Sequence, residues 1–394
     1  MNYDKDIYRN RLSPDYKVVT MPKKEFVWFD DRQVLDYLQS EVGRKNLLPA
    51  ISIASSPDCN MACPHCIYNA GEKTDEGLTP EEKISLLEEA VDLGAKYLQV
   101  CHEGEPVLDP AVLHLIEKAS ESGLVTFMYS NASLITPEIA KRLYENDVCL
   151  GIKLDSFNPE VFDKMLGERK AEEVYRGLEN LLDSGYRQPT HRNGKTYTRL
   201  GLVTTLTSIN TENIDEIKDV ARYSWDNNIF FGIARLEQGG RATGKVWEAL
   251  RIPDRDRVIG FVDWCSEQTG INYWEAQPTP YCIGVCGLQI ADNGNVWMTP
   301  YGGSCDFTEP DGESFPERII TIGNVKRDSL GHILQRAWGF RQAVFQNGIL
   351  DRKLADYERT KDVYPNGLQD CGSARTHTLF VPFYQYVKGI VEQL

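Results

Sequence analysis

The chain has 394 residues, of which 41% are hydrophobic and 26% charged, a composition typical of a folded globular protein rather than a disordered or fibrous one. Its net charge of −15, with one short and interrupted basic cluster at residues 187–199, excludes broad binding to a nucleic acid backbone. A charged N-terminus and the absence of any run of 18 apolar residues predict a cytoplasmic protein with no signal peptide and no membrane partner.

The first predicted strand follows an N-terminal stretch that is polar and aromatic. Residues 1–48 are predicted to be an N-terminal extension with one helical segment at residues 31–42. From Ala50 onward, short apolar or β-branched runs alternate with longer segments of helical periodicity, which is typical of βα units on a parallel sheet. The six expected strands are Ala50–Ser55, Tyr97–Cys101, Val125–Tyr129, Cys149–Leu154, Leu200–Leu206 and Ile229–Ala234.

Two of the intervening helices have clear beginnings. Thr79 is an N-cap followed by a proline and two acids, and its helix is expected to end at Gly94. Thr136 begins a second helix in the same way, which runs to Asn146. Strands that alternate with helices fit an open barrel or a doubly wound sheet, and in both folds ligands gather at the carboxyl ends of the strands.

The pattern changes after residue 257. A helix to Gln268 precedes a stretch rich in Pro, Gly, Asn and Asp, with short strand-like pieces at residues 287–291, 295–299 and 319–322. Mixed helix and loop follow to the C-terminus. We therefore divide the chain into an extension (residues 1–48), a core (49–257) and a C-terminal part (258–394).

Ten cysteines stand out, because clustered thiols in a reducing compartment more often bind metal or do redox work than form disulfides. Cys59, Cys63 and Cys66 have the spacing Cys-x3-Cys-x2-Cys in the loop directly after the first strand. Three thiolates so close can bind three irons of a [4Fe-4S] cube and leave the fourth iron open, as a catalytic metal requires. The alternatives are buried free thiols, or a zinc site completed by His65 or a distant residue.

This segment resembles the radical SAM superfamily, whose hallmark is this cysteine spacing in this loop of a partial (β/α)6 barrel. The resemblance covers roughly residues 48–240. It implies an α/β fold, a partial (β/α)6 barrel with a small C-terminal cluster-binding α+β extension. It also implies that the open iron binds S-adenosylmethionine (SAM), which an electron from a flavodoxin- or ferredoxin-like donor cleaves to methionine and a 5′-deoxyadenosyl radical.

A second motif follows the second strand. Glu103-Gly104-Glu105-Pro106 resembles the family's Gly-Gly-Glu-Pro motif, with Glu103 in place of the first glycine. In the family, the backbone and the acid of this motif contact the amino group of SAM, which assigns that role here to Gly104, Glu105 and Pro106. A solvated acidic loop is the alternative interpretation.

Four further residues take SAM-binding roles by the same resemblance. Asn131 after the third strand and Ser156 after the fourth, in the run Lys153-Leu-Asp-Ser, match positions that meet the carboxylate and the ribose. Arg235 could pair with the carboxylate as a bidentate fork, and Tyr68 could stack on the adenine. Ordinary turn, capping and surface roles are the alternatives. His65 is given no role.

The late cysteines form a second set, Cys282, Cys286, Cys305 and Cys371. The sequence around them resembles the SPASM and shorter twitch extensions of radical SAM enzymes, which bind auxiliary [4Fe-4S] clusters. Four cysteines can ligate one cube but not two, and the dense Cys-x2-Cys array of a full SPASM domain is missing, so one auxiliary cluster in a twitch-like domain is expected. A small β extension with incidental thiols is the alternative.

The solitary cysteines are expected to be core residues, because a free cysteine behaves as a small buried hydrophobe. Cys101 and Cys149 nevertheless lie on predicted strands, where a thiol facing the interior could donate a hydrogen atom to a substrate radical. Such a donor would make the enzyme an epimerase, whereas an auxiliary cluster next to the radical would make it an oxidoreductase. The four clustered cysteines favour oxidation.

Two substrate classes fit the sequence. The first is a small molecule, such as a sugar, an aminocyclitol or a nucleoside-like compound, as for twitch-type relatives. The alternative is a peptide or protein, as for maturases of ribosomal peptides or sulfatases. Residues 1–48 are too few for the leader-binding domain that many peptide modifiers carry, so the sequence favours the small molecule.

Overall fold

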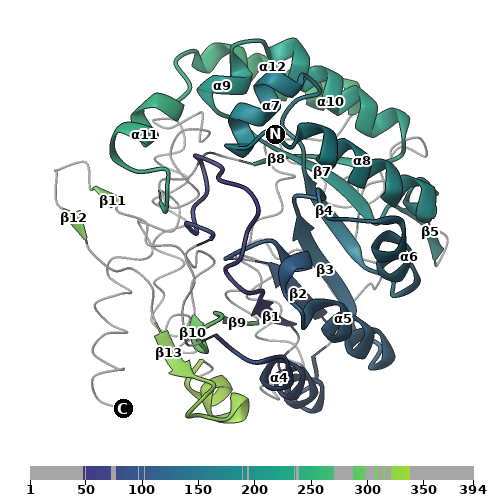
Figure 1. The fold of residues 1–394 in the computed structure, drawn as a ribbon, viewed down its shortest axis with the longest axis vertical. Coiled ribbons are helices and arrows are strands. Elements are labelled where there is room, and N and C mark those ends of the chain that lie inside the picture. Colours follow the sequence, from purple (N-terminus) through teal and green to yellow (C-terminus); the bar gives the residue numbers. More distant parts are fainter. Residues whose placement is uncertain are drawn as a thin grey trace, which may run out of the picture.

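Six parallel strands form the centre of the molecule and are hydrogen-bonded in the order β1-β2-β3-β4-β7-β8 (Figure 1). They are β1 (Ala50–Ala54), β2 (Tyr97–Cys101), β3 (Val125–Ser130), β4 (Cys149–Lys153), β7 (Leu200–Thr205) and β8 (Phe230–Ala234). All six predicted strands are confirmed, with ends that differ by at most one residue. The computed structural model describes residues 48, 50–71, 77–95, 97–101, 103–188, 190–192, 195–234, 236, 239–269, 287–297, 307–308, 314–315 and 321–337.

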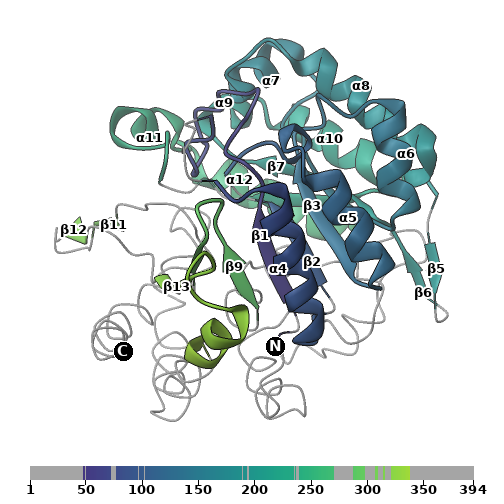
Figure 2. The ribbon, with the colours of Figure 1, turned by 60° about the horizontal axis from the view of Figure 1, so that its bottom comes forward.

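The helices lie along the outer face of this curved sheet (Figures 1 and 2). They are α4 (Pro80–Asp92), α5 (Val112–Glu121), α6 (Pro137–Glu145), α7 (Pro159–Leu166), α8 (Ala171–Leu181), α9 (Ser208–Thr211), α10 (Ile214–Asp226), α11 (Gly244–Leu250) and α12 (Arg255–Thr269), with short turns η1 (Pro106–Leu108) and η2 (Leu182–Tyr186). Their apolar stripes pack on strand residues such as Leu98, Met128 and Ile152 in one buried core.

The predicted helix beginnings are confirmed. Before α4, the Thr79 hydroxyl accepts from the Glu82 N–H at 3.2 Å, and the Glu82 carboxylate accepts from the Thr79 N–H at 2.7 Å, which is a complete capping box. Before α6, the Thr136 hydroxyl accepts from the Ile139 N–H at 3.3 Å. These caps fix where each helix leaves the preceding loop.

The C-terminal strands continue the same sheet beyond β1, which gives the full order β13-β10-β9-β1-β2-β3-β4-β7-β8. β9 (Leu288–Ile290) is parallel to β1, and β10 (Asn295–Trp297) and β13 (Thr321–Asn324) follow as antiparallel strands. The first two strand-like pieces predicted after residue 257 are confirmed, and the third begins two residues later than expected. The sheet is open, with β8 and β13 at its ends, so the α/β partial barrel is confirmed.

Two small antiparallel pairs lie outside this sheet: β5 (Thr190–Arg192) with β6 (Lys195–Tyr197), and β11 (Phe307–Thr308) with β12 (Ser314–Phe315). The first hairpin was not expected, although Asn-Gly between its strands is a strong sequence signal for such a turn. The helix predicted at residues 31–42 lies outside the described residues. A helix over residues 330–337 follows β13.

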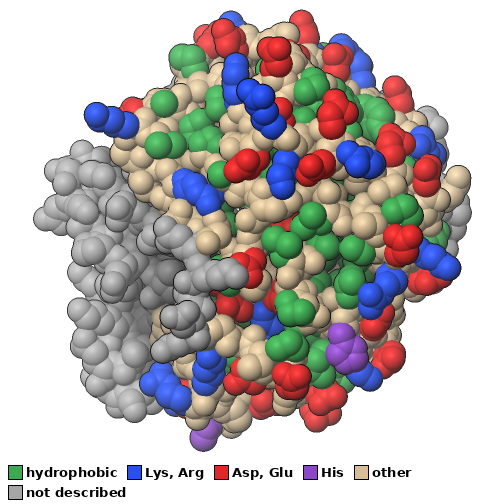
Figure 3. All heavy atoms as spheres, viewed as in Figure 1, with side chains coloured by type: hydrophobic (Ala, Val, Ile, Leu, Met, Phe, Trp, Pro, Cys, Tyr) green, Lys and Arg blue, Asp and Glu red, His purple; other side chains and the backbone are tan. Residues whose placement is uncertain are grey.

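Acidic and basic side chains are interspersed over the described part of the face in Figure 3, with no broad basic surface there. Within the described ranges, no helix is both long and apolar enough to cross a membrane.

Candidate functional site

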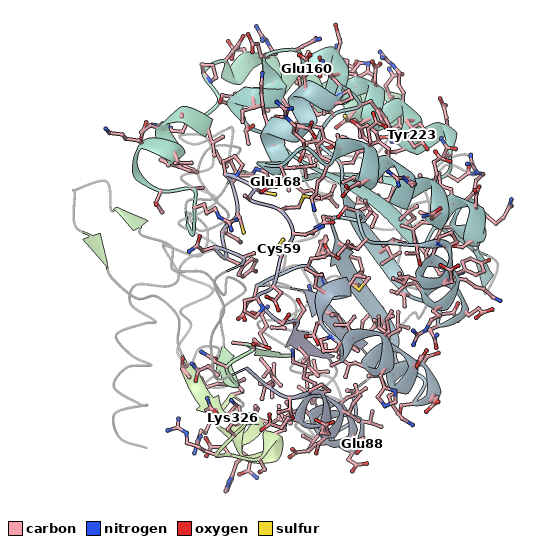
Figure 4. The ribbon with its side chains drawn as sticks, viewed as in Figure 1. Cys59, Glu88, Glu160, Glu168, Tyr223 and Lys326 are labelled. Atoms are coloured by element: carbon pink, nitrogen blue, oxygen red, sulfur yellow. The ribbon has the colours of Figure 1, made fainter. Side chains whose placement is uncertain are left out.

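Cys59, Cys63 and Cys66 lie together in the loop that follows β1, at the carboxyl edge of the sheet (Figure 4). All three are half-buried free thiols. Burial raises the pKa of the Cys63 thiol to about 12, and the neighbouring thiols Cys66 and Cys59 add to this rise. The three sulfurs therefore lie close enough to interact electrostatically, and positive charge bound beside Cys63 would favour its thiolate.

Backbone packs directly against this loop from three sides. A Cβ atom on Gly104, which follows β2, would lie 2.2 Å from the carbonyl oxygen of Ser56. A Cβ on Gly167, which ends α7, would lie 2.2 Å from the carbonyl oxygen of Ala62. Gly240, after β8, makes a similar close approach. Because only glycine fits at such distances, these residues determine the path of the loop across the carboxyl ends of the strands.

Glu105 is the buried acid beneath the loop. Its carboxylate accepts from the Ser130 hydroxyl at 2.7 Å and from the Asn131 N–H at 2.7 Å, and its own N–H donates to the carbonyl of Asp58 at 2.8 Å. Burial raises the pKa of Glu105, and the hydrogen bonds from Asn131 and Ser130 oppose the rise. Glu105 therefore joins the ends of β2 and β3 to the cysteine loop. Pro106 is buried beside it as the first residue of η1.

The Asn131 side chain is also bound to the cysteine loop. Its amide nitrogen donates to the Asn60 side-chain oxygen at 2.9 Å, and its oxygen accepts from the Ser133 N–H at 2.9 Å. The Asn60 amide in turn donates to the Ser133 hydroxyl at 2.8 Å. Asn60, the residue after the first cysteine, had no role in the sequence interpretation. Both polar atoms of the Asn131 side chain therefore already have protein partners. The contact of Asn131 with the carboxylate of SAM stays a prediction.

A second polar group lies at the carboxyl end of β4. The Lys153 ammonium is 2.9 Å from Asp155 Oδ1 and 2.5 Å from the Thr205 hydroxyl. Lys153 also lowers the pKa of Cys63, against the larger effect of burial. Its charge therefore reaches the cysteine loop from the sheet side.

Two buried polar atoms near Lys153 lack hydrogen-bond partners among the described residues. These are Oδ2 of Asp155, which is fully buried, and Nδ1 of His65, which is 8% exposed. Burial lowers the pKa of His65, with Lys153 adding to the effect, so the imidazole is neutral. Orphaned buried atoms beside an ammonium fit a ligand that carries both a donor and a carboxylate, as the amino acid part of SAM does. The sequence interpretation gave His65 no role in SAM binding, although its position between two cysteines of the motif indicates that it lies close to the proposed cluster.

The other predicted SAM contacts are placed differently. Ser156 is fully buried and faces α10, where its hydroxyl donates to the Glu216 carboxylate at 2.8 Å and accepts from the Asn158 N–H at 2.9 Å. Tyr68 lies half-buried in the cysteine loop. Arg235 lies outside the described residues. The roles of Ser156, Tyr68 and Arg235 stay predictions.

The two candidate hydrogen donors lie at opposite ends of their parallel strands. Cys101 is the last residue of β2 and pairs with Ala54, immediately before the cysteine loop. Cys149 begins β4 and is fully buried against Tyr97 and Val125 at the amino end of the strands. This placement gives a donor role for Cys149 no support. Cys265 is buried in α12, as expected for a core residue.

A buried ion triad adjoins the site. The Lys83 ammonium, on α4, lies 2.6 Å from Asp109 Oδ2 and 2.9 Å from Asp292 Oδ1, and all three side chains are at most 5% exposed. Asp109 Oδ2 also accepts from the Ser56 N–H at 2.7 Å, at the start of the cysteine loop. The triad therefore connects the loop to the turn between β9 and β10.

Glu103 sits beside this triad. Its φ of +65° is a value that favours glycine, which is the residue the family motif has there. Its carboxylate accepts from the Asp292 N–H at 3.2 Å. Burial raises the pKa of Glu103 to about 7 from its usual 4.5, and the Asp292 charge contributes to this rise.

We expect Glu103 to make stability depend on pH. The folded protein holds the proton up to about pH 7, whereas the unfolded chain releases it near pH 4.5, so stability falls as pH rises between these values. The loss amounts to about 3 kcal/mol. Glu103→Gln should remove this decline in urea unfolding measured across the interval. The exposed Glu138→Gln is the control, and parallel pH profiles for wild type and Glu103→Gln would contradict the prediction.

Among the described residues, no group of three His, Cys, Asp or Glu side chains is arranged to hold a metal ion. The cluster and the zinc assignments of the cysteine loop both stay predictions. The late cysteines, Cys282, Cys286, Cys305 and Cys371, lie outside the described residues.

Comparisons with known proteins agree with this geometry. The model of the "Radical SAM superfamily" matches residues 53–224. The chain is 26% identical over 326 residues to the mycofactocin maturase MftC of Mycobacterium tuberculosis strain H37Rv, which covers 80% of this chain and 72% of that protein.

Two solved structures share the fold. Streptococcus suis SuiB bound to S-adenosylmethionine has a TM-score of 0.54 and 14% identity, covering 79% of this chain and 74% of SuiB. Native anSMEcpe with bound AdoMet has a TM-score of 0.50 and 15% identity, covering 73% and 80%. With its cysteine loop at the carboxyl edge of an open parallel barrel, the segment of residues 53–224 belongs to the radical SAM superfamily.

Proposed function

We propose that this radical SAM enzyme is a maturase that modifies a peptide. The observation that carries the proposal is the similarity to MftC, which is named a maturase. This similarity extends over 326 residues, well beyond the radical SAM domain. SuiB, which shares the fold, has also been solved bound to the precursor peptide SuiA. These similarities favour the peptide over the sugar, aminocyclitol or nucleoside-like substrate that the sequence alone favoured.

In this proposal Cys59, Cys63 and Cys66 hold a [4Fe-4S] cluster, which when bound supplies the electron that cleaves SAM. The thiols must lose their protons for this, and the cation Lys153 opposes the effect of burial at Cys63. In the same proposal Lys153 binds the carboxylate of SAM, and the buried polar atoms without partners near its ammonium support this role. A flavodoxin- or ferredoxin-like protein would supply the electron.

Around these groups the chain orients the substrate. Glu105 is held by Ser130 and Asn131 and fixes the backbone at Gly104, which packs on the cysteine loop. A ligand amino group at this edge would meet backbone carbonyls and a buried carboxylate. The rigid setting of Glu105 therefore favours one orientation of SAM relative to the loop.

A comparison of two strains tests the peptide assignment. Cells producing the wild-type chain and cells producing Cys59→Ala/Cys63→Ala/Cys66→Ala are analysed by mass spectrometry for both small peptides and metabolites. We expect a peptide whose mass or fragmentation differs only when the wild type is present. If only a sugar, aminocyclitol or nucleoside differs, the small-molecule function is correct and the peptide proposal fails.

A further part of the proposal is one auxiliary [4Fe-4S] cluster bound by Cys282, Cys286, Cys305 and Cys371, which would favour oxidation of the substrate radical. We expect anaerobically reconstituted wild type to contain about eight irons per chain, four per cube. Replacing these four cysteines with alanine should leave about four irons. Iron and sulfide analysis that finds about four in both proteins would remove the auxiliary cluster.

A further inference from the structure

Arg241, which lies outside the cysteine loop, donates three hydrogen bonds to its backbone carbonyls. Its backbone N–H donates to the carbonyl of Cys66 at 2.9 Å. Its guanidinium donates from Nη1 to the carbonyl of Cys63 at 3.5 Å and from Nη2 to the carbonyl of Ala70. One side chain therefore spans residues 63–70, the half of the loop that contains two of the three thiols.

The turn that carries Arg241 is itself fixed. Gly240, with φ +51°, approaches so closely that a Cβ atom there would lie 2.3 Å from the carbonyl oxygen of Cys66. Gly239 and Ala242 exchange backbone hydrogen bonds at 2.8 and 3.3 Å across the turn. Ala242 is fully buried against Leu236 and residues of α11. The guanidinium therefore leaves a rigid turn, and its fork reaches two carbonyls at once.

Arg241 also brings a positive charge to the cysteine loop, because its guanidinium is hydrogen-bonded to the carbonyls of Cys63 and Ala70. The guanidinium contacts described above are all to backbone carbonyls, which satisfy its donors without cancelling its charge. Lys153, the cation on the other side of the loop, differs because Asp155 lies 2.9 Å from its ammonium.

We propose that Arg241 is a positioning residue for the iron-sulfur cluster. Its fork holds residues 63–70 in the shape in which the thiols face one cube, and its charge favours the reduced, more negative form of that cluster. The inference rests on the cluster assignment of the proposed function and is independent of the substrate. It differs from the role predicted for Arg235, which concerned SAM itself.

Two variants separate shape from charge. Arg241→Lys keeps the charge and loses the fork, whereas Arg241→Gln loses both. In the full chain without its cluster, hydrogen exchange followed by mass spectrometry should be about tenfold faster for residues 62–71 in both variants, because the loop opens locally more often. Helix α8 should exchange as in wild type.

The reduction potential of the reconstituted cluster, measured by redox titration with EPR detection, should separate the same variants. In Arg241→Gln we expect the reduction equilibrium to be about tenfold less favourable, a shift of about 59 mV to more negative potential. Arg241→Lys should stay close to wild type. If a variant assembles no cluster, hydrogen exchange in the cluster-free chain still tests the role of the fork.

Arg199→Gln is the matched control, because Arg199 is a buried cation that donates to the carbonyl of Tyr144. It lies directly before β7, at the amino ends of the strands and away from the cysteine loop. The variant should change neither measurement. Gly240→Ala should speed exchange of the loop without removing the charge. Wild-type exchange in Arg241→Lys would overturn the role of the fork, and an unchanged potential in Arg241→Gln would overturn the role of the charge. A wild type that binds no [4Fe-4S] cluster at all would instead refute the proposed function.

Discussion

Replacing Cys59, Cys63 and Cys66 together with alanine should lower 5′-deoxyadenosine formation to the background rate of the reagents. The three thiols are the ligands that we propose for the cluster, and an iron that the protein does not hold cannot bind and reduce SAM. The measurement is product formation from SAM under anaerobic, reducing conditions, by liquid chromatography and mass spectrometry.

The fold should survive this change. The loop is held mainly through backbone groups, by Glu105, Arg241 and the glycines that pack on it, and the bond from the Ala70 N–H to the Cys66 thiol is long, at 3.5 Å. The circular dichroism spectrum should therefore match wild type. Cys265→Ala, which removes a buried thiol in α12, should lose some stability and keep SAM cleavage. Product formation by the triple variant would show that the cluster assignment is wrong.

Lys83→Met should destabilise the full chain by about 3–5 kcal/mol, because it leaves two buried carboxylates without their counter-charge. The ammonium lies within 3 Å of both Asp109 and Asp292 at 2% exposure, so water cannot replace it. Urea unfolding at neutral pH measures the effect. Cluster content should fall as well, since Asp109 holds the Ser56 N–H at the start of the cysteine loop.

Lys118→Met is the control for Lys83→Met. Lys118 also pairs with a carboxylate, Glu121 at 2.8 Å, but both side chains are exposed, so its loss should change stability little. Adding Asp292→Asn to Lys83→Met should recover part of the lost stability by removing one uncompensated charge. If Lys83→Met unfolds at the same urea concentration as Lys118→Met, the triad does not stabilise the protein.

The sequence predicted the barrel well because its signals are local. Each strand is a short apolar run, and caps such as Thr79 and Thr136 mark the helix beginnings with side-chain hydrogen bonds over three residues. The β5–β6 hairpin was not predicted, although the Asn-Gly pair between the two strands is a sequence signal for a hairpin. Buried Lys83 was overlooked for a related reason: it lies at helical spacing from Leu86, Leu87 and Ala90, on the apolar stripe of α4, where a lysine needs an unseen partner.

The site was predictable only in part, because its contacts join residues that are distant in sequence. The spacing of Cys59, Cys63 and Cys66 identified the loop, but nothing local shows that Arg241 binds it from beyond β8. Ser156 follows a strand as a ligand residue should, yet its hydroxyl accepts from the N–H of Asn158, the N-cap of α7, and donates to Glu216 on α10. The direction in which a side chain points at the end of a strand depends on how the next helix packs. The hydrophobic periodicity of the sequence does not predict that packing.

The parallel pairing of β9 with β1 affects how the chain folds during synthesis. Ile53 pairs with Ile290, so more than 200 further residues must be synthesised before the outer edge of β1 can pair with β9. At typical elongation rates this takes roughly 10 to 50 s, during which the open edge can recruit other chains. Asp292 arrives in the same late segment, so Lys83 has only Asp109 as a carboxylate partner until then. The nascent barrel is therefore most vulnerable to aggregation on the side that later carries the C-terminal strands.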